Sequence, residues 1–315
     1  MEQVQSITGV AGVDIGKLWL DVDVCEASHH QRFHHTPEGL AQMVVWLRDQ
    51  GVHRVGMEAS GQYERDVREA LEASGFEAIV LQPLEVRAFA RYRRIRLKSD
   101  KADAHLIAKA TAAYEGVVAR FDPYLVDLAE LMTAYEQTSQ LLAQVRTLCE
   151  HHRLEVIKAM DSERILYLEA QKVRLRQLIL EAIRAHPDLK ARFQLLKSLP
   201  GVGDITAMSL VIRMPELGRM APGKPAALLG VAPFDRDSGQ FHGKRFITGG
   251  RSRPRTFVYL AALSAKRMNS GFKAFAQRLL DGGKPKKVVI VAIMRKLIEA
   301  ANIVLKRKTP WIKYA

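Results

Sequence analysis

The sequence predicts an α/β unit followed by two all-α regions, which we place at residues 1–120, 121–188 and 189–315. The first region starts with strand-like runs and then alternates strands with amphipathic helices, the pattern of a mixed sheet covered by helices. The second region contains no glycine, and its apolar residues recur at helical spacing. The third region is helical again around a stretch rich in glycine and arginine.

The first region opens with strands. Ser6–Asp14 is a short apolar run, and the next run places Leu18, Leu20, Val22 and Val24 at every second position, the period of a half-buried strand. Short apolar runs then alternate with runs of helical period, which is typical of helices that connect neighbouring strands. We expect strands over residues 53–58 and 76–81 and helices over residues 37–50, 62–74 and 84–92.

The second region predicts an antiparallel, coiled-coil-like helical hairpin that turns near Asp161–Ser162. We assign its apolar stripe to packing within the hairpin, with oligomerisation as a second interpretation. The third region predicts a helix, a tight glycine turn and a second helix over residues 195–213, the shape of a helix-hairpin-helix. Further helices are expected over residues 256–268, 271–281 and 284–307.

The charge of the chain predicts a polyanionic partner. The 315 residues carry 48 Lys and Arg against 34 Asp and Glu, a formal net charge of +14, which favours nucleic acid first and an acidic membrane surface second. Residues 1–90 carry 7 basic against 14 acidic side chains, whereas residues 189–315 carry 25 against 6. This division indicates separate tasks for an acidic first unit and a basic last one.

The two cysteines, Cys25 and Cys149, lie far apart and form no C-x-x-C pair, which disfavours a disulfide framework or a zinc finger. The first residues show no signal-peptide pattern, and no apolar run reaches the ~18 residues of a membrane-spanning helix. We therefore expect a protein of a reducing cytosol with no membrane partner.

Four carboxylates predict a site for Mg²⁺ or Mn²⁺. Asp14 and Glu58 end apolar strands, and Asp100 and Asp103 lie one turn apart on a predicted helix. Hard divalent cations prefer oxygen ligands, and a pair of such ions activates an attacking oxygen and stabilises a leaving one. Any one of these acids alone is more simply explained as a solvated carboxylate, but the set of four points to a metal centre.

Three segments predict contacts to the phosphate backbone of nucleic acid. They are the basic run 91–98, the glycine turn 198–207, where a helix start offers N–H groups to a phosphate, and the stretch 232–256. A solvated basic face and an ordinary helix end are the simpler explanations for the first two. The predicted contact residues are Arg91, Arg93, Arg94, Arg96, Lys98, Gly201, Gly203, Lys244, Arg245, Arg251, Arg253 and Arg255.

Ser238 is a candidate nucleophile because it lies in the third of these segments, before Gly239 and among arginines. A serine attacks a phosphodiester when nearby cations or a metal ion stabilise its alkoxide. From composition alone an ordinary Ser-Gly turn is the simpler explanation. Neither a Ser-His-Asp order nor a G-x-S-x-G elbow supports a hydrolase.

Several runs resemble the insertion-sequence 110 family of transposases. Three runs resemble the family's metal-binding domain, namely GVDIGKLWLDV, MEASGQYERDV and LKSDKADAHLIA. Its C-terminal transposase domain is resembled by SLPGVGDITA, LLGVAPFDRDSGQFHGKRFITGGRSRPRTFVYLAALSA and GKPKKVVIVAIMRKLI. These runs span nearly the whole chain in the right order. Ser99 stands where the family usually has Thr, and Arg255 fits best the spacing of the family's arginine.

The resemblance implies a RuvC-like, RNase H-type fold for the first region. The family's Asp-Glu-Asp-Asp metal set then falls on the four acids named above, and its nucleophilic serine falls on Ser238. It also implies a site-specific recombinase of double-stranded DNA that uses Mg²⁺ (or Mn²⁺) and a structured guide RNA encoded by the element. Dimers would pair into a tetramer with acids from one subunit and the serine from another. A bacterial, nucleoid-associated protein is expected.

Three other functions stay open at this point. A Holliday-junction or structure-specific endonuclease would use the same acids with water as the nucleophile, without Ser238. A sugar kinase or actin-like ATPase also begins with a D-x-G-K strand, but its further glycine-rich loops find only a poor match in Thr248–Gly250. A nucleic-acid-binding protein without activity would explain the charge and leave the acids without a role.

Overall fold

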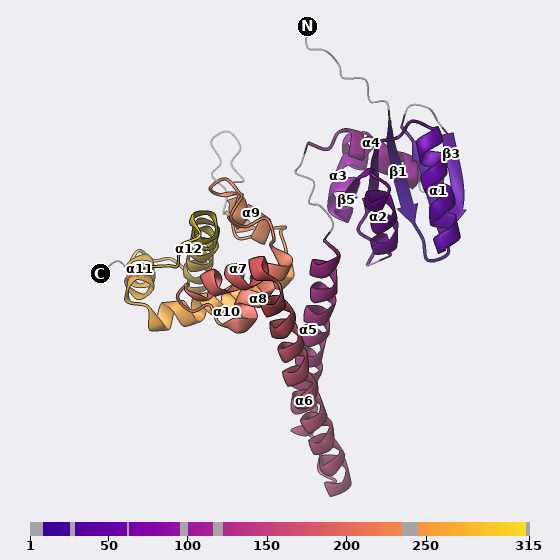
Figure 1. Cartoon of the computed structure of the whole chain (residues 1–315). Helices are drawn as coiled ribbons and strands as arrows, with labels where there is room; N and C mark the ends of the chain where they lie inside the picture. Colours follow the sequence, from indigo (N-terminus) through magenta and orange to yellow (C-terminus); the bar gives the residue numbers. More distant parts are fainter. Residues whose placement is uncertain are drawn as a thin grey trace. The chain divides into compact units, whose positions relative to one another are not determined.

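The computed structural model describes residues 9–25, 29–61, 63–94, 100–115, 122–234 and 245–312. The chain divides into two compact units, Met1–Phe121 and Asp122–Ala315 (Figure 1), each with cores of its own. The long helices that the sequence analysis set apart as a middle region share the main core of the second unit. Among the described helices, none is both long enough and apolar enough to cross a bilayer.

The first unit contains a five-stranded mixed sheet in the order β3-β2-β1-β4-β5, which confirms the mixed α/β arrangement. β1, β2 and β3 pair antiparallel, whereas β4 and β5 run parallel to β1. Gly12 of β1 pairs with Gly56 of β4, and Asp14 of β1 pairs with Asp21 of β2. The strands are β1 Val10–Ile15, β2 Trp19–Val24, β3 His29–His34, β4 Arg54–Glu58 and β5 Glu77–Leu81.

One face of this sheet packs against two amphipathic helices. Val13, Leu20 and Met57 point to this face and join the buried stripe of α1 and the core residues of α2. Figure 1 shows α1 and α2 in front of the sheet and α4 behind its strands. Three helices lie close to their predicted ranges: α1 Pro37–Asp49, α2 Glu64–Ala73 and α3 Pro83–Tyr92. The fourth, α4 Asp100–Ala112, contains Asp100 and Asp103, which were predicted to lie on a helix.

The opposite face carries α4 in direct contact with the strand backbones. A Cβ atom on Gly12 would lie 2.2 Å from the amide nitrogen of Ala108 and 2.3 Å from the carbonyl oxygen of Ala104. A Cβ on Gly56 would lie 1.6 Å from Oγ1 of Thr111. Two glycines on neighbouring strands therefore let α4 approach closer than any larger residue would allow.

The prediction of a half-buried β2 is wrong. Its polar positions Asp21 and Asp23 are only 3% and 2% exposed, because α4 contacts β2 as well as β1. Both carboxylates are tolerated in the interior since each accepts hydrogen bonds from basic side chains. An alternation of apolar and acidic residues therefore arises here in a strand covered on both faces.

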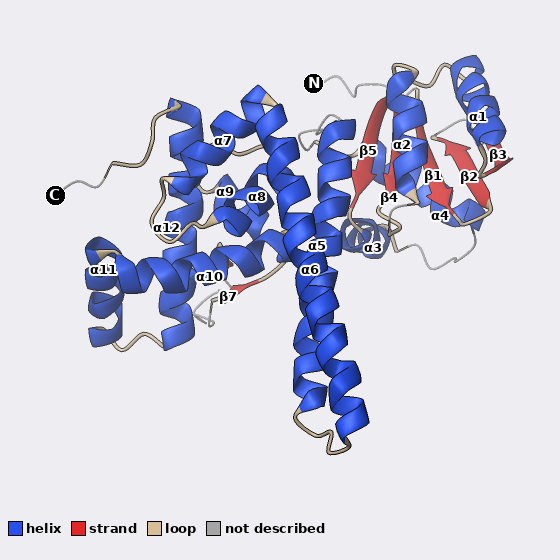
Figure 2. Cartoon of the chain, turned by 60° about the horizontal axis from the view of Figure 1, so that its bottom comes forward, coloured by secondary structure: helices blue, strands red, loops and turns tan. Residues whose placement is uncertain are grey.

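The second unit starts with the expected antiparallel hairpin, α5 Pro123–Cys149 and α6 Glu155–Ala185, whose helices run side by side in Figure 2. The turn predicted at Asp161–Ser162 is wrong, because the chain reverses at residues 150–154. Asp161 instead lies inside α6, where its Oδ2 is 2.6 Å from Nδ1 of His152 in the turn. Its side chain thus braces the turn from within a continuous helix.

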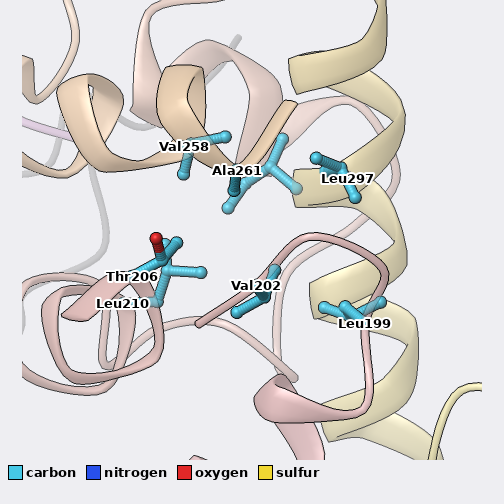
Figure 3. Close-up of a pocket in the computed structure, with 8 residues that line it drawn as sticks. Leu199, Val202, Thr206, Leu210, Val258, Ala261 and Leu297 are labelled. Carbon is cyan, nitrogen blue, oxygen red and sulfur yellow. The ribbon is translucent and has the colours of Figure 1, made fainter. Parts of the chain in front are cut away.

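The remaining helices form the main core of the second unit around α8, α10 and α12. The glycine turn between α7 and α8 is confirmed, and α10 begins four residues before its predicted start. Figure 3 shows a small pocket in this core, lined by Leu199, Val202, Thr206, Leu210, Val258, Ala261, Leu297 and Ile298, with no charged group to hold a ligand. The remaining elements are α7 Pro187–Lys197, α8 Asp204–Arg213, α9 Lys224–Leu229, β6 Pro233–Phe234, β7 Phe246–Ile247, α10 Ser252–Met268, α11 Ser270–Asp281 and α12 Lys286–Arg307.

Substitution of Gly12 by alanine should destabilise the first unit. The added Cβ meets helix backbone, which moves only with the whole of α4, so we expect a loss of about 1–3 kcal/mol. Urea unfolding followed by circular dichroism measures it. Gly282→Ala is the control, because its φ is −77° and its nearest Cβ contact is an ordinary 3.5 Å. Equal stability of the two variants would contradict the close approach of α4.

Candidate active site

Asp14 and Glu58 lie on neighbouring strands, on the face of the sheet that α4 covers. Gly12 and Gly56 face α4 and are paired in register, so the residues two positions further along point to the same side. Those residues are Asp14 near the end of β1 and Glu58 at the end of β4, and both are half-buried. Neighbouring strands lie ~4.8 Å apart, which keeps the two carboxylates close to each other.

Helix α4 adds Asp103 to this end of the sheet. Asp103 directly precedes Ala104, whose carbonyl oxygen lies over Gly12. Burial raises the pKa of the Glu58 carboxyl above its ordinary value, Arg87 opposes the rise, and the Asp103 carboxylate adds to it. Glu58 and Asp103 are thus close enough to repel each other, although they come from elements far apart in the sequence.

The chemistry of these residues fits a divalent cation. They supply oxygen ligands only, and the raised pKa of Glu58 means that its negative charge is held at a cost that a cation would offset. Among the described side chains, no group of three or more His, Cys, Asp or Glu is placed to hold a metal ion. The side chain of Asp100, at the start of α4, lies outside the described ones. The four-acid metal centre therefore stays a prediction.

Side-chain contacts that were not predicted from the sequence link α4 and β3 to the buried carboxylates of β2. Nδ1 of His105, in α4, lies 2.6 Å from Oδ2 of Asp23. Arg32 donates to Asp21 through Nε at 3.1 Å and Nη2 at 2.8 Å, and Nε2 of His30 lies 2.9 Å from the same carboxylate. The contact of His105 lies two residues from Asp103 and so sets how α4 presents that acid. In the sequence Asp21 and Asp23 resemble solvent-facing strand residues, so no local pattern signals these contacts.

The basic run after α3 is only partly described. Arg91, Arg93 and Arg94 are exposed, as phosphate contacts require. The guanidinium of Arg93 lies 5.6 Å from the ring centre of Phe89. Arg96 and Lys98 lie outside the described residues, so contact between this run and nucleic acid stays a prediction.

The glycine turn before α8 is held by packing and by charge. Gly201 has a φ of +76°, and a Cβ there would lie 2.4 Å from the carbonyl oxygen of Ala261 in α10. Gly203 is exposed with open space around it. Asp204 begins α8, and its hydrogen bonds from Lys197 at 2.7 Å and Arg176 at 2.6 Å hold its pKa below the ordinary value. The turn is therefore rigid, with one carboxylate already at the helix start.

The arginines predicted to contact nucleic acid in the stretch 232–256 make contacts within the protein. Arg251 binds both oxygens of Glu216 at 2.5 and 2.8 Å, and Arg253 donates to Thr133 at 2.6 Å. Arg255 donates to the carbonyl oxygens of Gly230 and Gly249 at 3.2 and 2.8 Å. These three arginines anchor both ends of the segment.

Ser238, the predicted nucleophile, and Lys244 lie in residues 235–244, outside the described residues, and Arg245 at their border is exposed. The described part of the chain therefore holds the anchors of this segment, between β6 and β7, and leaves the role of Ser238 untested.

Known proteins match along almost the whole chain. Residues 11–189 match the DEDD-type IS110 family model, which is described as a transposase, and residues 193–277 match the model of the transposase IS116/IS110/IS902 family. The pilin gene-inverting proteins of Moraxella bovis and Moraxella lacunata are each 26% identical over 318 residues. Each of these alignments covers 96% of this chain and 97% of the relative.

The pKa of Glu58 predicts how stability responds to loss of its charge. Because the folded pKa lies above the unfolded one, ionisation of Glu58 destabilises the fold above the folded pKa and has no effect below the unfolded one. We expect Glu58→Gln to raise the melting temperature of the metal-free protein by about 1–3 °C at pH 7. The gain should shrink as the pH falls toward 4.

Differential scanning calorimetry in EDTA measures this effect. Glu77→Gln is the matched control, since Nε of Arg54 donates to Glu77 at 2.6 Å and loss of that partner should bring no gain. A Glu58→Gln protein less stable than wild type at pH 7 would show that its carboxylate is held by favourable contacts instead.

Proposed function

Since the chain belongs to the IS116/IS110/IS902 family of transposases and is a DNA recombinase, we propose that it cuts and rejoins DNA through Ser238 with the help of Mg²⁺. The observation that carries the metal part is the position of Asp14 and Glu58 on the face covered by α4, where burial, and after it the Asp103 carboxylate, raises the pKa of Glu58. Such acids favour a bound cation, and a cation is what a nearby phosphate requires.

The relatives support a reaction that rejoins what it cuts. Their name describes inversion of a pilin gene, and their similarity covers nearly the full length of both chains. Inversion of a DNA segment needs cleavage at two places and religation with exchanged ends. A covalent protein–DNA bond keeps the energy of the broken phosphodiester for that second step, whereas hydrolysis by water loses it.

The proposed chemistry uses residues from both units. Asp14, Glu58, Asp100 and Asp103 would hold the cation, which would polarise the scissile phosphate and stabilise the departing oxygen. Ser238 Oγ gives its proton to water and bonds to phosphorus. The bond from phosphorus to the DNA oxygen breaks, and that oxygen takes up a proton from water. A DNA hydroxyl then loses its proton to water and attacks the phosphoserine, and the released Ser238 Oγ takes up a proton. The number of phosphodiester bonds is unchanged.

The proposal also covers the fold of the first unit, the RNA partner and the oligomeric state. The strand order β3-β2-β1-β4-β5 is compatible with an RNase H-like, RuvC-like fold, whose catalytic acids come from the central strand, its neighbour and a helix. The family resemblance favours a guide RNA encoded by the element and dimers that pair into a tetramer. The excess of 25 Lys and Arg over 6 Asp and Glu in residues 189–315 supports a nucleic-acid partner for the second unit.

A trapping experiment separates this function from that of an endonuclease with water as its nucleophile. The protein is incubated with Mg²⁺, the element's RNA and labelled DNA that carries the element's ends and flanking sequence. We expect wild type to form a covalent protein–DNA adduct, detected on a denaturing gel. Ser238→Ala should give neither adduct nor recombinant, and Asp14→Asn should reduce both at least a hundredfold. Ser252→Ala, in the same arginine-rich stretch, is the control and should behave as wild type.

Cleavage without an adduct by Ser238→Ala would assign the protein to the endonuclease class. Full recombination by Asp14→Asn would remove the metal role of the acids.

A further inference from the structure

An exposed patch of aromatic and basic side chains continues the face that bears Asp14 and Glu58. We name it the edge patch and define it as Lys17, Trp19, Arg32 and His34. Trp19 of β2 and His34 of β3 are cross-strand partners, with ring centres 3.9 Å apart and planes inclined by 35°. The guanidinium of Arg32 lies 5.9 Å from the centre of the Trp19 ring. The patch therefore combines a stacked pair of rings with a cation.

The edge patch is accessible. Trp19 is 40% exposed and the Arg32 side chain 46% exposed, and Lys17 and His34 are also exposed. β3 pairs only with β2 among the described strands, so the patch lies at an edge of the sheet. By contrast, Leu20 and Phe33 lie on the opposite face of the same strands and are buried in the core. The hydrophobic core thus accounts for one face of these strands and leaves Trp19 outside it.

The register places the patch next to the acids. Asp14 pairs with Asp21, and Trp19 lies two residues before Asp21 on the same face of β2. Two residues of a strand span about 7 Å, so Trp19 lies within roughly one nucleotide of Asp14 along the sheet. A short turn joins β1 to β2, with Gly16 N–H donating to the carbonyl oxygen of Trp19 at 2.9 Å. That turn carries the exposed Lys17, two residues before Trp19.

The patch is preorganised. The bonds from Arg32 to the buried carboxylate of Asp21 fix the direction of the guanidinium before any ligand arrives. The contact between the Trp19 and His34 rings likewise limits their movement. The side chains of the patch are therefore largely ordered before a ligand binds, so binding costs less side-chain entropy.

We propose that the edge patch binds an unpaired nucleotide of the strand that enters the acidic site. Its base stacks on the Trp19–His34 pair, and its phosphate meets Lys17 and Arg32. Aromatic rings beside cations are the usual means of holding single strands, because every base offers a π face. A base inside a duplex is already stacked on both sides, so the patch selects unpaired nucleotides. The proposal rests on the proposed function, since it takes nucleic acid as the ligand of this face.

Trp19 fluorescence tests the proposal in the full chain. Trp46→Phe with Trp311→Phe leaves Trp19 as the single tryptophan of the chain, and Ser238→Ala with EDTA suppresses the reaction. We expect saturable quenching by short oligo-dT or oligo-rU and little by a duplex of equal length. The two oligonucleotides show whether the strand held there is DNA, RNA or either. No quenching by either single strand, or equal quenching by the duplex, would overturn the proposal.

Substitutions in the otherwise wild-type chain complete the test, with fluorescence anisotropy of labelled oligonucleotides as the measurement. Trp19→Ala should weaken single-strand binding about tenfold, and Trp19→Phe should restore most of it because the ring is kept. Leu18→Ala is the matched control, as Leu18 is adjacent and 66% exposed but has no ring. Equal binding by Trp19→Ala and wild type would overturn the proposal. A loss of binding in Leu18→Ala as large as that in Trp19→Ala would also overturn it.

Failure of this inference and failure of the proposed function are distinguishable. Unquenched Trp19 in a protein that forms the Ser238 adduct would remove the edge patch alone. Quenching by single strands in a protein whose Ser238→Ala variant still recombines would remove the serine mechanism alone. The Trp19 fluorescence could instead be quenched when the chain self-associates and stay unchanged when oligonucleotides are added. That result would assign the edge patch to a protein contact.

Discussion

The close contact of α4 with the backbones of β1 and β4 is the constraint on which the first unit depends. It is possible because Gly12 and Gly56 are paired in register and leave no Cβ between sheet and helix. The same contact brings Asp103 near Glu58 and covers a face of β2 that would otherwise be solvated. Packing and candidate chemistry are thus two consequences of one helix position.

Electrostatics divides the work between the units. In the first unit buried or half-buried carboxylates are either hydrogen-bonded to a basic side chain, as Asp23 is to His105, or held at a cost, as Glu58 is. In the second unit basic side chains prevail, yet Arg251 is engaged in an internal ion pair. Net charge therefore indicates which class of partner is favoured. The individual contacts show which charged side chains remain available to bind that partner.

The period of apolar residues predicted nearly every helix and strand, because burial of one face is a local property of the sequence. The sequence did not predict the turn at residues 150–154, since the helix-compatible Asp161 was taken for a turn residue. Nor did it predict the buried state of Asp23, because burial of a strand's second face depends on a helix some 80 residues away in the chain. Asp14 and Glu58 were found because both end strands, but their proximity depends on register, which only the structure supplies.

Binding of Mn²⁺ to the full chain without nucleic acid tests the central claim most directly, with the free ion followed by electron paramagnetic resonance. We expect wild type to bind the ion and Asp14→Asn, Glu58→Gln and Asp103→Asn each to weaken binding at least tenfold. Glu77→Gln, on the same sheet but paired with Arg54, should bind as wild type does. Wild-type affinity in Glu58→Gln would contradict the claim that the face under α4 is a metal centre.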